Sequence, residues 1–382
     1  MTSLTLALGK YTERVLASMH RSAVKTLSLL MWALSEVREP KLSEWARRLR
    51  LYQTDPEGNR KAYSFKYKKF RIWRFLTRSE FLAKEVWEAI PHHLLDPRDV
   101  PEDTKPILVT LDWTKMGKGF WALVIGLPYP GRALPLAVEV VAEGFLENAM
   151  TDLEIGRVRE FLGWLSPSLR SRVVILADRG FAKTELFEAI EDEKASYVIR
   201  LHRDAQVWVD LGWRELQTLP VAPGETRLYP RVPYSLEHQK KLSVAVRRRP
   251  EGKANDPQDD TWSLATHRPE VSLAPEGYSK RFKTEELFKD WKSMLDVAGH
   301  QFKNGEGLER LLGVVGLYYV FVVLEGQAKT THERLRQVTQ DRKGQPELGI
   351  FRQAQAVLGL WAWETEGPSL DVLMPSWVQV HG

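Results

Sequence analysis

Two aspartates have the residue type and the sequence context of a metal site. Residues 107–111 form a short apolar segment that ends at Asp112, and residues 173–177 form a second one that ends at Asp178. Ligands of α/β sheets gather at the ends of strands, and a carboxylate that a rigid strand holds there can face a hard divalent cation. An Asp at the end of a strand is also a common turn or cap residue. Neither position therefore identifies a metal site by itself.

A third acidic side chain, Glu285, belongs to a segment with helical periodicity. At about 100° per residue, Tyr278, Arg281 and Lys292 fall within about 60° of one another on the same stripe as Glu285. Such a stripe presents a carboxylate flanked by two cations and a phenol. That set suits a metal-bound phosphodiester, because the acid can hold the ion while the cations hold phosphates. An ordinary amphipathic helix with a charged solvent face has the same periodicity.

The spacing of these four residues resembles a family signature. Tyr, two residues, Arg, three residues, Glu, six residues and Lys form the signature of cut-and-paste DDE transposases of the insertion-sequence-4 group. Asp112 in Leu-Asp-Trp-Thr and Asp178 in Ala-Asp-Arg-Gly-Phe look like that family's first and second aspartates. Residues 262–266, Trp-Ser-Leu-Ala-Thr, resemble its Trp-x-Leu-x-Thr strand. The resemblance extends over residues 105–325, with a looser match before them.

The resemblance implies a catalytic, metal-binding role for three carboxylates, Asp112, Asp178 and Glu285. They would hold two Mg²⁺ or Mn²⁺ ions. It also implies DNA-binding roles for Arg281 and Lys292, which would contact phosphates near the transposon end, and for Tyr278, which would position the same strand.

In that family, a tryptophan from the β segment ahead of the glutamate can stack on a flipped base while a DNA hairpin forms. Trp262 is the DNA-binding candidate in the strand that resembles the family's, and Trp208 and Trp213 are further candidates. Each of the three could equally be a core residue, because buried tryptophans are common packing residues.

The expected function is that of a DNA transposase. Two metal ions about 4 Å apart activate the attacking oxygen and stabilise the leaving oxygen of a phosphodiester. We therefore expect cleavage of transposon ends and strand transfer into target DNA, with hairpin ends by family analogy. The expected partners are the two double-stranded DNAs and a second copy of the chain in a synaptic homodimer. The alternatives are a ribonuclease-H-fold nuclease without strand transfer and a non-catalytic, domesticated DNA-binding transposase.

The pattern of apolar and polar residues also predicts the strands and helices that must position these residues. Alternating strands and helices over residues 105–204 predict an α/β fold with a ribonuclease-H-like catalytic core. A β-rich insertion would follow at 205–268, and a helix carrying Glu285 would complete the core at 269–300. We expect a helical, basic DNA-binding domain at 1–100 and C-terminal helices at 301–382.

Charge and composition agree with a nucleic-acid partner. Residues 38–84 hold 14 Lys or Arg and 5 Asp or Glu, a local balance of 14 − 5 = +9, whereas the whole chain carries +5. Cations at this density can neutralise phosphates, although a solvated basic helix face would look the same. The chain has no cysteine, so it has no disulfide framework. Its longest apolar run, residues 311–324, is too short for a span of about 20 residues and predicts a buried helix. We expect a cytoplasmic protein of the bacterial nucleoid, without a membrane.

Overall fold

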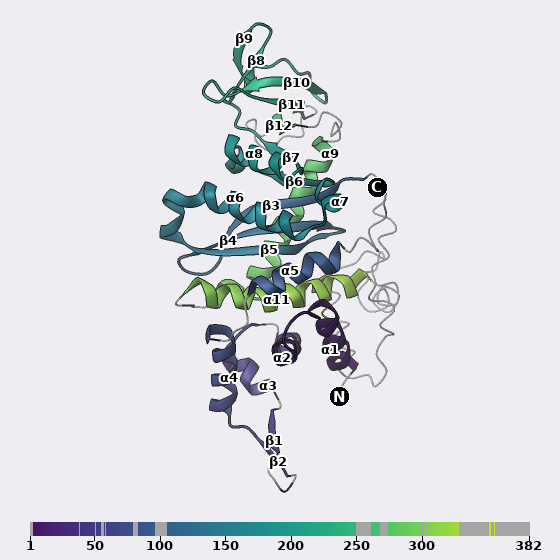
Figure 1. Cartoon of the computed structure of the whole chain (residues 1–382), viewed down its shortest axis with the longest axis vertical. Coiled ribbons are helices and arrows are strands. Elements are labelled where there is room, and N and C mark those ends of the chain that lie inside the picture. Colours follow the sequence, from purple (N-terminus) through teal and green to yellow (C-terminus); the bar gives the residue numbers. More distant parts are fainter. Residues whose placement is uncertain are drawn as a thin grey trace, which may run out of the picture.

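The computed structural model describes most of the chain. The described residues are 3–37, 39–49, 51–54, 57, 59–78, 83–95, 105–249, 261–267, 274–299, 302, 304–327, 351–352 and 355. Most of the C-terminal region that we predicted to be helical, residues 301–382, lies outside them beyond residue 327. The described part is elongated, with a large sheet above and a group of N-terminal helices below (Figure 1).

A mixed sheet forms the centre of the molecule. Five strands build its first part: β3 (Ile107–Lys115), β4 (Phe120–Tyr129), β5 (Arg132–Ala142), β6 (Val173–Ala177) and β7 (Ser196–Arg200). Strands β3, β4 and β5 pair antiparallel, whereas β3, β6 and β7 pair parallel. Every residue of β6 is buried, as expected for a parallel strand covered on both faces. The predicted mixed α/β fold is confirmed, and it is consistent with a ribonuclease-H-like core.

The segment that follows this core extends the same sheet. Its strands are β8 (Gln206–Val209), β9 (Gly212–Glu215), β10 (Thr226–Tyr234), β11 (Lys240–Arg248) and β12 (Thr261–Thr266). Strand β12 returns to pair antiparallel with β7, so that Leu264 lies opposite Arg200. Within the described residues the result is a ten-stranded sheet in the order β5-β4-β3-β6-β7-β12-β11-β10-β8-β9. The β8–β9 hairpin lies at its far end (Figure 1).

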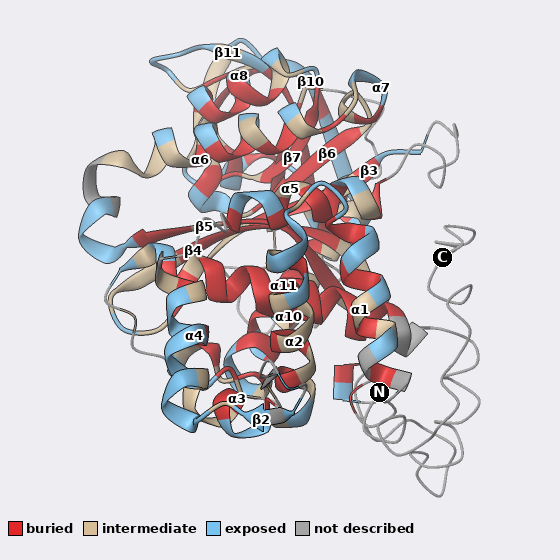
Figure 2. Ribbon diagram, turned by 60° about the horizontal axis from the view of Figure 1, so that its bottom comes forward, coloured by how far each residue is buried: buried red, intermediate tan, exposed pale blue. Residues whose placement is uncertain are grey.

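Helices cover the core sheet on both sides. Helices α6 (Leu146–Trp164) and α8 (Thr184–Asp192) pack against each other next to β5 and β7. On the other side, β5 contacts α5 (Ala83–Leu94), α10 (Lys283–Lys289) and α11 (Gly305–Gln327). Figure 2 shows buried residues concentrated in α11 and in the strands of the core. Glu285 therefore enters the core on a helix that lies directly against the antiparallel strands.

The N-terminal helices form a separate layer beneath α11. They are α1 (Ser3–Val15), α2 (Arg21–Val37), α3 (Leu42–Arg48) and α4 (Phe65–Arg78), with a short hairpin of β1 (Tyr52–Thr54) and β2 (Arg60–Ala62) between α3 and α4. Helix α1 packs on α2, and α3 packs on both α2 and α4. Since α11 contacts α2, α4 and α5, it is the apolar layer that joins the N-terminal helices to the sheet (Figure 1).

Helix α11 is the buried helix that the apolar run predicts. By length and composition it is the one described helix that could cross a membrane, but 94% of its apolar window, Gly305–Leu324, is buried inside the protein. At Gly316 the helix meets the indole ring of Trp87 so closely that an added methyl group would overlap the ring. The glycine therefore sets how near α5 can approach α11.

We expect Gly316→Ala to destabilise the protein. Overlap with the buried Trp87 ring should cost about 1–3 kcal/mol, which exceeds the gain of about 1 kcal/mol from better helix propensity. The control is Gly156→Ala in α6, where a methyl group would meet none of the described atoms within 4 Å. There the propensity gain should act alone and raise stability. Urea unfolding of both variants measures the difference, and a stabilised Gly316→Ala would contradict this packing.

A half-buried carboxyl group, that of Glu309, should make stability depend on pH. The pKa of Glu309 is raised from 4.5 to about 7, chiefly by burial and also by the charge of Glu139, while Arg157 opposes the rise. Because the folded state holds this proton more tightly than the unfolded state, the site loses stability as the pH rises from about 4.5 to about 7.

We expect Glu309→Gln to stabilise the protein at pH 8, by up to about 3 kcal/mol, and to leave stability unchanged at pH 4.5. The control is Glu306→Gln, because Glu306 is exposed and its ion pair with Arg310 spans 3.5 Å. A surface pair of this kind should change stability by less than about 1 kcal/mol at either pH. Thermal unfolding of both variants at the two pH values tests this, and equal effects of Glu309→Gln at both would count against a half-buried, protonated Glu309.

Candidate active site

Asp112 lies inside β3 rather than beyond its end. The apolar pattern predicts a strand that stops at Leu111, and this was wrong. The antiparallel pairing with β4 continues to Lys115 and places Asp112 opposite Val124. The parallel pairing with β6, in contrast, stops where Leu111 meets Ala177. Asp112 is therefore the first residue past the parallel pair, and its side chain is 14% exposed.

Asp178 follows β6 directly and turns the chain. Its Oδ1 accepts a hydrogen bond from the backbone N–H of Gly180 at 2.9 Å, and it caps the short helical turn Arg179–Phe181. The capping role that the sequence left open is therefore present. Leu111 pairs with Ala177 in parallel register. The residues that follow them, Asp112 and Asp178, therefore lie side by side where the parallel pairing ends. The charge of Asp178 is one of the causes that raise the pKa of Asp112.

Arg281 joins Asp112 to Glu285. Its Nη1 donates to Asp112 Oδ2 at 2.9 Å, and its Nη2 donates to Glu285 Oε1 at 2.9 Å. The Arg281 side chain is 10% exposed, whereas that of Glu285 is 55% exposed. The guanidinium thus lies between two of the three predicted carboxylates, where we had expected it to point at a phosphate.

Negative charge is concentrated around Asp112. The pKa of Asp112 is raised to about 6, chiefly by burial and also by the charges of Asp178 and Glu285, while Arg281 opposes the rise. Asp178 and Glu285 therefore both lie within electrostatic reach of Asp112. A cation among them would favour the ionised form of Asp112.

The oxygen donors of the three predicted carboxylates fit a hard divalent cation. In the present structure, however, Arg281 lies between Asp112 and Glu285 and keeps them apart. Carboxylate oxygens are ligands that Mg²⁺ prefers, and the three predicted ligands all supply them. Across the described residues, no three His, Cys, Asp or Glu side chains stand close enough to hold an ion together. For Glu285 to share an ion with Asp112, the Arg281 side chain that separates them must first move.

The helix that carries Glu285 is not the uniform α-helix that the periodicity predicts. Helix α9 (Ala274–Ser279) continues into a tight 3₁₀ turn (Lys280–Phe282), then into α10, and then into a wider π-helical turn (Asp290–Met294). The prediction of one straight stripe was therefore wrong in detail. The apolar neighbours of the stripe, Leu287 and Trp291, are fully buried as expected.

Tyr278 and Lys292 differ in exposure. Tyr278 is 1% exposed, and burial raises its pKa to about 12. Its ring meets that of Trp262 edge-on at 5.2 Å. Lys292 is exposed; partial burial lowers its pKa, and the charge of Asp112 opposes that change. Tyr278 thus packs beneath the site, whereas Lys292 stands at its rim near Asp112.

The three candidate tryptophans fall in two places. Trp262, on β12, packs against Tyr278, and the guanidinium of Arg249 lies 5.2 Å from its ring centre. Trp208 and Trp213 form an edge-on pair across the β8–β9 hairpin, with ring centres 5.7 Å apart. That hairpin is at the far end of the sheet (Figure 1). Trp262 is therefore the candidate that adjoins the segment of Arg281 and Glu285.

The sequence did not single out Glu154, which the structure places within electrostatic reach of Asp178. This side chain of α6 is 1% exposed. It accepts hydrogen bonds from Trp113 Nε1 at 2.9 Å and from Lys183 Nζ at 2.8 Å. Its pKa is raised, chiefly by burial and also by the charge of Asp178. The sequence pattern that could have revealed Glu154 is its helical spacing, which places it on the same face of α6 as the buried Val158 and Phe161.

Comparison with known proteins bears on the segment that carries most of this site. No curated protein matches the chain. Residues 154–321 match the family described as transposase DDE domain, a stretch that includes Asp178, Arg281, Glu285 and Lys292. Asp112 lies ahead of the matched stretch. The match supports a transposase DDE domain over residues 154–321.

Proposed function

We propose that the chain is a cut-and-paste transposase of the insertion-sequence-4 group. It would bind the inverted-repeat ends of a transposon, cleave them, and transfer them into target DNA. The observation that carries the proposal is that Arg281 bonds to both Asp112 and Glu285, while Asp178 follows the strand that pairs in parallel with the strand of Asp112. Three carboxylates brought together by the fold are the ligand set that two-metal phosphodiester chemistry requires.

In this proposal each residue of the site has a distinct task. Asp112 and Asp178, on neighbouring strands, hold two Mg²⁺ or Mn²⁺ ions together with Glu285. The bound ions supply an activated attacking oxygen and a stabilised leaving oxygen. Arg281 and Lys292 contact phosphates of the DNA strand, and the buried Tyr278 fixes the segment from which Arg281 projects.

The N-terminal region, residues 1–100, would supply much of the DNA contact. Helix α4 contains no acidic residue. Its exposed cations are Lys66, Lys69, Arg71 and Arg74. Between them stand Phe70 and Trp73, stacked with ring centres 5.9 Å apart. Cations alternating with aromatic rings suit a phosphate backbone and its sugars and bases.

A pocket beside Trp262 could receive a base that leaves the duplex. It is lined by Arg247, Arg249, Trp262, Pro275, Glu276 and Ser279. A base can stack on an aromatic face, and arginines can hold the adjoining phosphates. We propose that this pocket takes up a flipped base while a hairpin end forms, so that Trp262 contacts DNA. Family analogy further suggests a synaptic homodimer and a cytoplasmic, nucleoid-associated location.

The remaining boundaries are proposed as well. Residues 105–204 and 269–300 would form the catalytic core, residues 205–268 a β-rich insertion that extends its sheet, and residues 301–382 a helical region available for dimer contacts. The described part of this last region is dominated by α11, which packs within the protein.

Incubation with DNA tests the proposed function. The substrates are linear duplexes from the DNA that flanks the gene, with a supercoiled plasmid as target and Mg²⁺ as the metal. We expect cleaved ends and plasmids joined to them. Cleavage without joined products would favour the ribonuclease-H-fold nuclease. Binding without metal-dependent nicking would favour a non-catalytic DNA-binding protein.

A further inference from the structure

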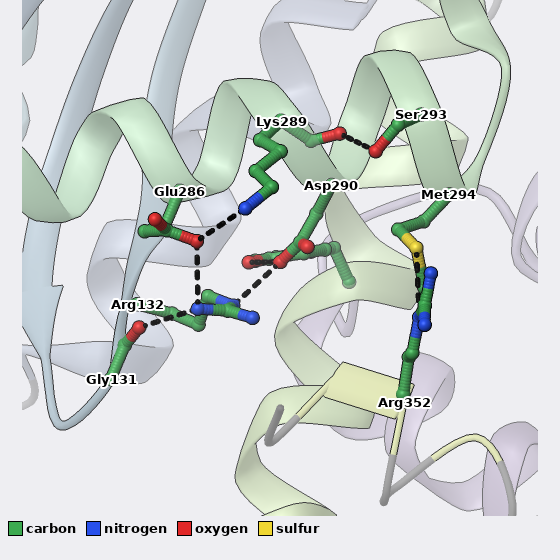
Figure 3. A network of polar contacts seen from close by, with 9 residues as sticks. Gly131, Arg132, Glu286, Lys289, Asp290, Ser293, Met294 and Arg352 are labelled. Atoms are coloured by element: carbon green, nitrogen blue, oxygen red, sulfur yellow. Dashed lines mark hydrogen bonds and ion pairs between the residues drawn. The ribbon is translucent and has the colours of Figure 1, made fainter. Parts of the chain in front are cut away.

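A half-buried arginine forms ion pairs with the helix that carries Glu285. Arg132, at the start of β5, is 15% exposed, and its Nε lies 2.7 Å from Asp290 Oδ2. Its Nη1 lies 3.2 Å from Glu286 Oε2 and also donates to the carbonyl of Gly131 at 2.9 Å. Figure 3 shows the guanidinium between the two acids of the helix. Strand β5 is thus tied to the residue directly after Glu285.

Tyr319 of α11 completes this network from a third element. Its hydroxyl donates to Asp290 Oδ2 at 2.8 Å. Asp290 is only 5% exposed, and Tyr319 is fully buried. A buried ion pair of this kind contributes little net stability compared with apolar packing, but it holds a particular arrangement, because breaking it leaves an uncompensated buried charge.

The contacts of Asp290 with Arg132 and Tyr319 lie at the point where the α-helix becomes a π-helical turn. Asp290 opens the π-helical turn Asp290–Met294, and the N–H of Leu295 bonds to the Asp290 carbonyl at 3.0 Å, five residues back. A π turn inserts an extra residue, which rotates everything after it relative to everything before it. Glu285 lies before the turn and Lys292 lies within it. The turn therefore sets the angle between these two side chains.

We propose that Arg132, Asp290 and Tyr319 are positioning residues that anchor the helix of Glu285 and its π turn to β5 and α11, and so fix where Glu285 lies relative to Asp112. The inference rests on the proposed function, because it concerns the same site. Glu285 reaches Asp112 through Arg281, and Lys292 lies within the electrostatic reach of Asp112. If the contacts of Arg132 and Tyr319 to this helix were lost, the segment that carries Glu285 would no longer be fixed against β5 and α11.

Two conservative variants test the network. Asp290→Asn keeps the shape and removes the charge, whereas Tyr319→Phe removes one hydrogen bond and keeps the ring. We expect the cleavage rate at saturating end DNA to fall by about 100-fold in Asp290→Asn, because small misplacements of a catalytic group have effects of this size. A smaller loss, about tenfold, is expected for Tyr319→Phe. The affinity for end DNA should remain at the wild-type level in both. Ser293→Ala, in the same turn, removes only a hydrogen bond to the Lys289 carbonyl and leaves the contacts of Asp290 in place, so it should cleave like the wild type.

Metal binding separates positioning from general stability. Calorimetric titration with Mn²⁺ alone should show weaker binding in Asp290→Asn than in the wild type. In a Glu285→Gln background the same substitution should cause no further loss, because the ligand through which it acts is already removed.

The outcomes distinguish the two claims. An Asp290→Asn variant that cleaves at the wild-type rate, or that weakens Mn²⁺ binding equally in both backgrounds, overturns the positioning role and leaves the proposed function intact. A wild-type protein that neither binds Mn²⁺ nor cleaves end DNA overturns the proposed function, and the positioning role with it. Should Asp290→Asn fail to fold, wild-type cleavage by Tyr319→Phe overturns the positioning role.

Discussion

Asp112→Asn, Asp178→Asn and Glu285→Gln are each expected to lower cleavage of transposon-end DNA by at least about 1,000-fold, because losing a metal ligand removes several kcal/mol of transition-state stabilisation. Each substitution replaces a carboxylate by an amide of nearly the same shape. Folding and DNA binding should therefore persist, since the proposed phosphate contacts belong to other side chains. Gel-based cleavage and end-binding assays on the same preparations measure the two properties separately.

The matched control for these variants is Asp152→Asn. Asp152 is an exposed aspartate on α6, the helix that also carries Glu154, and its loss should leave cleavage at the wild-type rate. Full activity in a variant that lacks all three predicted ligands would end the two-metal interpretation. A loss of DNA binding that parallels the loss of cleavage would instead indicate a structural role for the carboxylates.

Arg281→Ala is expected to have opposite effects on metal binding and on DNA cleavage. Arg281 occupies the space between Asp112 and Glu285 in the DNA-free protein, with both hydrogen bonds at 2.9 Å. Removing this cation leaves the carboxylates uncompensated, so that Mn²⁺ should bind more tightly without DNA. Cleavage should fall by about 10- to 100-fold, the equivalent of one or two charge-assisted hydrogen bonds to a phosphate.

The salt dependence of end binding gives a second measure of Arg281. If its guanidinium moves from the carboxylates to a phosphate, Arg281→Ala should reduce the slope of log K against log salt by about 1. Arg281→Lys should keep the slope and recover only part of the cleavage rate, because an ammonium cannot reproduce the paired geometry of the guanidinium. An unchanged slope in Arg281→Ala, together with unchanged Mn²⁺ affinity, would contradict both roles of this side chain.

The strands of the core could be predicted from the sequence because they are apolar runs of ordinary length. The runs before Asp112 and Asp178 are β3 and β6, and the long apolar run is α11. The family match supports the predicted transposase at this coarser level. The roles of the individual site residues stay predictions.

Other features depend on contacts between distant residues, which a local pattern does not contain. Strand β3 continues to Lys115, beyond the apolar segment 107–111, because β4 continues to pair with it. The π turn at Asp290 coincides with a buried ion pair to Arg132, on a strand far away in the sequence. The buried Glu154 likewise has partners from β3 and from the turn after β6. Periodicity placed Glu285 and Lys292 on one stripe, but it could not reveal the change of helix type between them.

The most direct test is a structure of the protein with Mn²⁺ and a transposon-end duplex, with the ions located by anomalous scattering. We predict two peaks about 4 Å apart, with oxygens of Asp112, Asp178 and Glu285 around them and with Arg281 turned onto a DNA phosphate. Glu285 remaining remote from both aspartates in that complex, or Mn²⁺ bound elsewhere with Arg281 still bridging Asp112 and Glu285, would contradict the shared metal site.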